Sequence, residues 1–127
     1  MAFYNVPVNL PHAATLANRI ELRLAAMQVF EHPDSEPLIL LIENLQGTIG
    51  RYEGANDPSD TETQEVVEKA ATIARSIVDQ IEQMQAGEDR LGQLIRNLFE
   101  CLGLGKEGAE ISLRAGEDPN SLLRPSE

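Results

Sequence analysis

The sequence predicts an all-α protein, a four-helix antiparallel bundle with a short N-terminal extended segment and an irregular C-terminal tail. Apolar residues recur at steps of three and four along four stretches that Gly and Pro residues separate. Aromatic residues make up only 4% of the chain and Trp is absent, so Leu, Ile, Val, Ala and Met must build the core. The very short turn between the third and fourth stretches favours an antiparallel hairpin.

The length of 127 residues suits one domain. We expect an extended segment over residues 1–9, the helical bundle over 10–103 and an irregular or partly ordered tail over 104–127. The sequence FYNVPV at Phe3–Val8 holds two of the five aromatic residues. It would either cover an open edge of the bundle or cross to a second subunit.

The first two helices are predicted over residues 10–31 and 36–52. Asn9 is a suitable N-cap for the first, and Pro33 stops it. Ser35 is the expected N-cap of the second helix. At the start of the second helix apolar residues lie nearly all round, Ile39 and Leu40 included, so this end is expected to be deeply buried.

The third helix is predicted over residues 60–86 and the fourth over 88–102. Ser59 or Asp60 can cap the third helix, and Gly87 is the expected left-handed residue at its end. The apolar side of the third helix covers an arc of about 160°, wider than one neighbour needs. It should therefore contact at least two other helices.

The polar side of the third helix carries two opposite-charge pairs at the i,i+4 spacing. These are Glu65 with Lys69 and Arg75 with Asp79. Each pair is predicted to lie in solvent and to contribute about 0.3 kcal/mol.

The outer side of the first helix carries a second, thinner apolar stripe opposite its main one. Its members are Leu22, Ala25, Ala26 and Val29. They are either scattered exposed apolar residues, which any surface has, or an interface with a subunit or partner. The chain has a net charge of -11, yet Arg19 and Arg23 balance the two acids of residues 1–33. Residues 1–33 can therefore self-associate more easily than the rest of the chain.

The histidines, the cysteine and the glycine-rich stretch do not occur in patterns typical of catalytic, metal or phosphate sites. His12 and His32 lie beside prolines at predicted helix ends, where capping or solvent exposure explains them. Cys101 lies at the margin of an apolar arc near a helix C-terminus, where the helix dipole disfavours a thiolate, so we expect a partly buried, unreactive thiol. The GLGKEG sequence of Gly103–Gly108 lacks the spacing of a phosphate-binding loop. We therefore expect no catalytic residue, cofactor or metal.

Carboxylates dominate the region around the start of the third helix. The acidic cluster comprises Glu53, Asp57, Asp60, Glu62, Glu65 and Glu68, with no Lys or Arg among them. The cluster either aids solubility and helix initiation or docks on a basic surface. Glu62, Glu65 and Glu68 are spaced by three, which resembles the carboxylate pattern of helical metal-dependent enzymes. However, Glu62, Glu65, Glu68, Asp79 and Glu82 fall on the polar side of one helix and should face water.

The charge and the ends of the chain limit the function. A net charge of -11 disfavours direct binding to nucleic acid or to anionic membranes. No signal peptide is evident. The longest apolar run, Leu38–Ile42, is too short to span a bilayer. We therefore expect a cytoplasmic location.

We expect a non-enzymatic protein that binds another protein as an adaptor, chaperone-like factor or inhibitor, and that forms a homodimer. One alternative is an acidic mimic of nucleic acid, comparable with small phage-encoded inhibitors, that occupies the basic channel of a nucleic-acid-binding protein. A second alternative is a helical metal-dependent phosphohydrolase.

Overall fold

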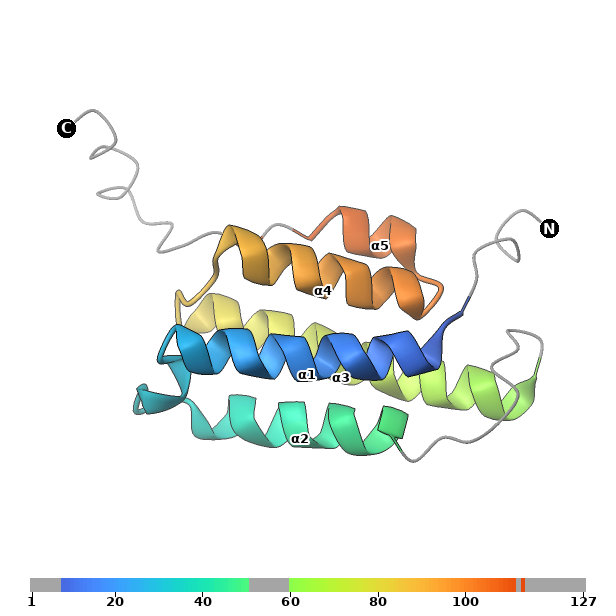
Figure 1. The fold of residues 1–127 in the computed structure, drawn as a ribbon, viewed down its shortest axis with the longest axis horizontal. Coiled ribbons are helices and arrows are strands. Elements are labelled where there is room, and N and C mark those ends of the chain that lie inside the picture. Colours follow the sequence, from blue (N-terminus) through green and yellow to red (C-terminus); the bar gives the residue numbers. More distant parts are fainter. Residues whose placement is uncertain (1–7, 51–59, 112, 114–127) are drawn as a thin grey trace.

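The computed structural model describes residues 8–50, 60–111 and 113, and these contain helices and no β-strand (Figure 1). The predicted all-α bundle is confirmed. Its elements, in chain order, are α1 (Leu10–Ala26), the short 3-10 helix η2 (Val29–Glu31), α2 (Glu36–Gly50), α3 (Thr61–Gln83), α4 (Asp89–Cys101) and α5 (Gly105–Ala109).

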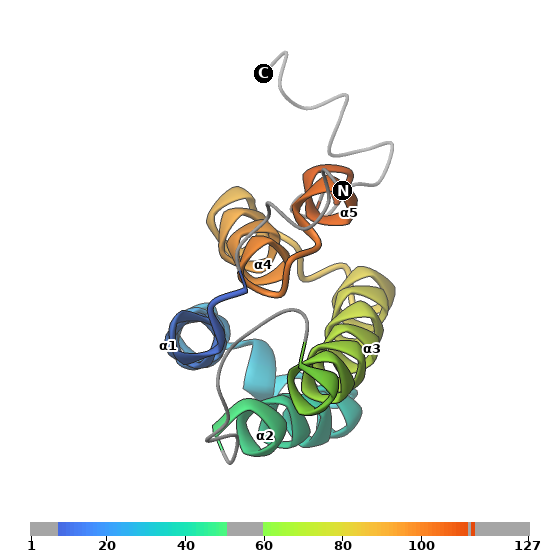
Figure 2. The ribbon, with the colours of Figure 1, turned by 90° about the vertical axis from the view of Figure 1, so that its right-hand side faces the viewer.

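Four helices occupy the corners of the bundle in the cyclic order α1, α2, α3, α4, as the end-on view shows (Figure 2). The α2–α3 and α1–α4 pairs have the most extensive contacts, and α1 also packs closely on α2. As predicted, α3 contacts two helices, but it meets α4 at few positions. The additional helix α5 packs on α4. The α3–α4 side is therefore the least closed side of the bundle.

Polar side chains cap three of the helices, two of them at residues that the sequence suggested. The Asn9 side chain accepts a hydrogen bond from the His12 backbone amide at 3.1 Å, and Asp60 accepts one from the Thr63 amide at the same distance. Glu88 caps α4 by accepting from the Leu91 amide. Each cap satisfies one backbone donor that the first helical turn leaves without an intrahelical partner. Of the two alternatives for the third helix, the structure uses Asp60.

The prediction that the first helix continues to residue 31 is wrong. α1 ends at Ala26, and Gln28 has a left-handed backbone (φ 63°) that turns the chain into η2. This turn buries Val29, and the Ser35 hydroxyl donates a hydrogen bond to the Phe30 carbonyl at 2.9 Å. The buried Val29 and this hydrogen bond compensate for the unfavourable left-handed conformation of a non-glycine residue. Ser35 directly precedes α2, as expected of its N-cap, and its carbonyl accepts from the Ile39 amide at 2.9 Å.

The other helix boundaries differ less from the expectations. α3 ends at Gln83, and Gln85 (φ 54°) rather than Gly87 adopts the left-handed conformation that follows it. The last described residue of α2 is Gly50, so residues 51 and 52 of the predicted second helix lie outside the described residues, as do residues 3–7 of the FYNVPV sequence. Val8 lies against Gly103 at the end of α4, and the Asn9 amide donates to the Cys101 carbonyl at 2.8 Å.

Among the described residues, the buried core lies between the four main helices and consists of small and aliphatic side chains with one aromatic ring. Phe99 is fully buried, and Leu113, beyond α5, is only 3% exposed. The expected tail therefore adds to the core. The largest fully buried residues of α1 to α4 are Leu10, Leu16, Ile20, Leu24, Leu38, Ile42, Leu45, Ile77, Ile81, Leu91, Ile95 and Phe99.

Candidate functional site

The outer face of α1, defined here as Leu22, Ala25 and Ala26, is the part of the predicted stripe that the structure leaves in solvent. Leu22 is 67% exposed, the largest exposure of any large apolar side chain among the described residues, and both alanines are exposed. Val29 was placed on this stripe by extending the helix, but it is 7% exposed and belongs to the core. The stripe is therefore shorter than predicted, because the helix ends before Val29.

Polar contacts set how α1 and α2 lie beside this face. The Gln46 amide donates to the Asn18 side-chain oxygen at 3.1 Å and to a Glu21 carboxylate oxygen at 2.8 Å. Because the two helices run antiparallel, one turn further along α1 brings Ala25 level with Ile42, one turn before Gln46 on α2.

The start of α2 is less buried than its composition suggested. Leu40 is 54% exposed, whereas Leu38 and Ile42 are buried in the core. The reason is geometric: α2 occupies a corner of the bundle, so a residue two positions from each buried neighbour faces outward. Leu40 is a second exposed apolar side chain, on a different helix from Leu22.

The acidic cluster is only partly described. Glu53 and Asp57 lie outside the described residues, and Asp60 caps α3. Glu62, Glu65 and Glu68 are exposed on α3, as are Asp79 and Glu82 further along it. Within the described ranges, no ion pair joins Glu65 to Lys69. The described acids of α3 therefore form a solvated surface and do not converge on an enclosed site.

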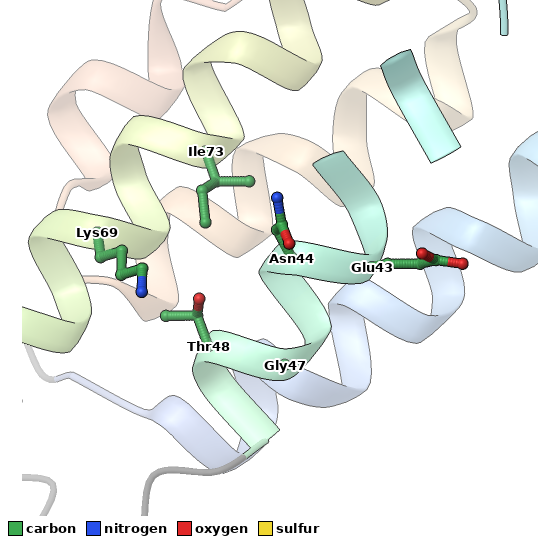
Figure 3. Close-up of a pocket in the computed structure, with 6 residues that line it drawn as sticks. All are labelled: Glu43, Asn44, Gly47, Thr48, Lys69 and Ile73. Atoms are coloured by element: carbon green, nitrogen blue, oxygen red, sulfur yellow. The ribbon is translucent and has the colours of Figure 1, made fainter. Parts of the chain in front are cut away.

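An open groove of about 320 Å³ lies between α2 and α3 (Figure 3). Lys69 and Thr48 point toward each other across it, and the Glu43 side chain points away. Its polar groups could form hydrogen bonds with a ligand, but they include no carboxylate directed at Lys69. The full lining is Glu43, Asn44, Gly47, Thr48, Lys69 and Ile73.

Two ion pairs connect helices that are distant in sequence. Arg23 of α1 donates to both carboxylate oxygens of Glu88, with Nε 2.9 Å from Oε1. These hydrogen bonds, together with the Leu91 amide, lower the pKa of Glu88. The Arg23–Glu88 ion pair therefore connects the C-terminal end of α1 to the N-terminal end of α4.

The predicted pair of Arg75 with Asp79 is wrong. Arg75 of α3 instead forms a bidentate pair with Glu107 of α5, with distances of 2.7 and 2.9 Å. Hydrogen bonding to Arg75 lowers the pKa of Glu107. The sequence does not reveal this pair because the two residues are 32 positions apart.

The remaining candidates for chemistry do not assemble into a site. His12 and His32 are exposed, and His32 Nδ1 accepts a hydrogen bond from the Asp34 amide at 3.0 Å. Cys101 is partly buried as expected, and burial, followed by the nearby Glu100, raises the pKa of its thiol. Over residues 8–50, 60–111 and 113, no group of three or more His, Cys, Asp or Glu residues could hold a metal ion.

No helix in the described part of the chain combines the length and the apolar composition that crossing a membrane requires. Comparison with models of protein families, with curated protein sequences and with solved structures finds no match to this chain. Any inference about function therefore depends on the outer face of α1, the exposed acids of α3 and the α2–α3 groove.

Proposed function

We propose that this protein acts by binding another protein, as a small adaptor, chaperone-like factor or inhibitor in the cytoplasm, and that it forms a homodimer. The supporting observation is the exposure of Leu22, with the exposed Ala25 and Ala26 one turn further along the outer face of α1. A leucine gains about 1.5–3 kcal/mol when it is transferred from water into an apolar contact. Small flanking residues allow a second helix to come close.

Charge favours a second copy of the chain as the occupant of this face. The net charge is -11, and all of the excess lies beyond residue 33, since Glu21 and Glu31 are balanced by Arg19 and Arg23. Two copies therefore repel each other least when their α1 helices meet. A twofold dimer would place the same face of each subunit in contact.

The experiment uses the double substitution Leu22→Asp with Ala25→Asp, which places two charges on the outer face of α1. We expect sedimentation to show a dimer for the wild type and at least a tenfold weaker self-association for the variant, a change of about 1.4 kcal/mol. Circular dichroism should show unchanged helicity because both residues are exposed.

Leu40→Asp is the matched control, because it changes an exposed leucine on α2. A wild type that sediments as a monomer and captures no partner through this face would contradict the proposal. An equal effect of Leu40→Asp would contradict the assignment to α1.

The exposure of Glu62, Glu65 and Glu68 supports the acidic mimic as a second candidate. Partner binding that weakens steeply with salt, and that is lost when these three residues are replaced by Lys, would favour the mimic over the α1 face.

A further inference from the structure

The α3–α4 side of the bundle is closed by a segment that lies outside the four main helices. α3 and α4 follow each other in the chain, yet they contact each other much less than α2 contacts α3 or α1 contacts α4. In the end-on view, α5 lies on the same side of α4 as α3 does (Figure 2). We define residues 105–111 together with Leu113 as the C-terminal strap.

The strap is attached to both helices. On α4, Gly108 lies so close that a Cβ there would be 2.7 Å from Phe99 Cβ and 3.1 Å from the Arg96 carbonyl oxygen. The Arg96 guanidinium also donates to the Ile111 carbonyl at 2.9 Å. On α3, the attachment is the bidentate pair between Arg75 and Glu107. The strap therefore connects α3 to α4 where their own contacts are few.

Leu113 completes the attachment to α4. It is 3% exposed, and its Cβ lies 3.6 Å from where a Cβ would stand on Gly92. Two glycines thus allow the close approach, Gly92 on α4 and Gly108 on α5. Among the described residues of the strap, Leu113 is the one large side chain that is fully buried.

The strap has little stability of its own. α5 has five residues, two of which are Gly105 and Gly108, and no side chain caps its start. A helix this short does not persist in water without tertiary contacts, and glycine weakens it further. The Arg75 and Glu107 side chains are 50% and 38% exposed, so their ion pair adds little. A short terminal segment with so little stability of its own can open locally while the rest of the protein remains folded.

We propose that the C-terminal strap is a releasable latch. When it is closed, it covers Phe99 and links α4 to α3 through the Glu107–Arg75 pair. When it opens, it uncovers the Phe99 side of α4 and breaks the ion pair to α3, so that α3 can move away from α4 while α1 and α2 stay in contact. This device acts on the side of α4 that faces α5 and does not depend on the proposed role of the α1 face.

The test compares Gly108→Ala with Gly105→Ala in the full chain. Both substitutions raise the helix propensity of α5. An added Cβ at Gly108 collides with Phe99, whereas at Gly105 its nearest neighbour is Glu100 Cγ at 3.6 Å, an ordinary contact. Only Gly108→Ala should therefore open the latch.

Hydrogen exchange at the Glu110 and Ile111 amides reports the opening, since these amides donate to carbonyls within the strap. We expect exchange at both amides to be at least tenfold faster in Gly108→Ala, and unchanged or slower in Gly105→Ala. The Ile20 amide in α1 should exchange at the wild-type rate in both variants. Unchanged exchange in Gly108→Ala, or an equal acceleration at Ile20, would overturn the proposal.

A distance measurement tests whether opening separates the helices. Spin labels at exposed Thr72 of α3 and Gln93 of α4 are introduced by cysteine substitution in a Cys101→Ser background. Gly108→Ala should broaden the distance distribution toward larger values, and Gly105→Ala should leave it unchanged. Labels at Arg19 of α1 and Asn44 of α2 serve as the control pair. A distribution that stays as narrow in Gly108→Ala as in the wild type, or an equal broadening of both pairs, would contradict the latch.

Discussion

The α1–α2 side and the α3–α4 side of the bundle are both made by helices that follow each other in the chain, but they are closed differently. α1 and α2 pack directly, and the connection between them buries Val29 and is held by the Ser35 hydroxyl. α3 and α4 meet at few positions, and the strap packs on α4 and reaches α3 through the Arg75–Glu107 pair. A short connection therefore does not ensure close helix packing, which also depends on where the side chains of each helix are directed.

The difference predicts two levels of stability within one small domain. The α1–α2 side should unfold only with the whole bundle, because its buried leucines and isoleucines belong to the same packed core as those of α3 and α4. The α3–α4 side should also open at lower cost through the strap. The following substitutions test this contrast.

The largest effect is expected for Leu24→Ala. Leu24 of α1 is fully buried, and shortening a buried leucine costs about 2–5 kcal/mol, from the lost apolar transfer and from the cavity left behind. Chemical denaturation should show the full loss in the global unfolding transition. A loss below about 1 kcal/mol would show that this side can repack and is not the rigid one.

A smaller effect is expected for Leu113→Ala, although Leu113 is buried almost as completely. Its cost cannot exceed the free energy with which the strap closes, since the bundle can remain folded with the strap open. The midpoint of global unfolding should shift clearly less than in Leu24→Ala, while exchange at the Ile111 amide accelerates. Equal shifts in the two variants would mean that the strap and the bundle unfold as one unit.

The smallest effect is expected for Arg75→Gln, and it should depend on pH. Arg75 lowers the pKa of Glu107 in the folded state, so the pair stabilises the fold above the usual Glu pKa of about 4.3. That contribution is lost as the pH falls through the lowered pKa. At pH 7 we expect a loss below about 1 kcal/mol, since both side chains are more than a third exposed, and at low pH the difference should disappear.

Arg19→Gln is the control for Arg75→Gln, because it removes one exposed positive charge that forms no ion pair within the described residues. Subtracting its effect corrects for the increased repulsion in a chain of net charge -11. A difference between Arg75→Gln and Arg19→Gln that persists at acid pH would show that the contribution is not electrostatic.

Part of the fold and of the candidate site could be predicted from local sequence. The caps at Asn9 and Asp60 follow from side chains that bond to backbone amides three residues away, so no distant contact is needed. Leu22, Ala25 and Ala26 were placed on the outer side of α1 by helical spacing alone. The same spacing failed for Val29, because it assumes that the helix continues, and Gln28 turns the chain before that point.

The periodicity of apolar residues was sufficient to establish an all-α bundle and the solvent-facing side of α3, because burial of an apolar side depends on spacing within each helix. The pairing of the helices depended on contacts between residues far apart in the chain. Arg75 with Glu107, Arg23 with Glu88 and Leu113 against Gly92 are separated by at least 21 positions. No local pattern specifies such partners. Only the folded chain, in which side-chain volumes must fit together at close packing, determined that a C-terminal segment would close the α3–α4 side.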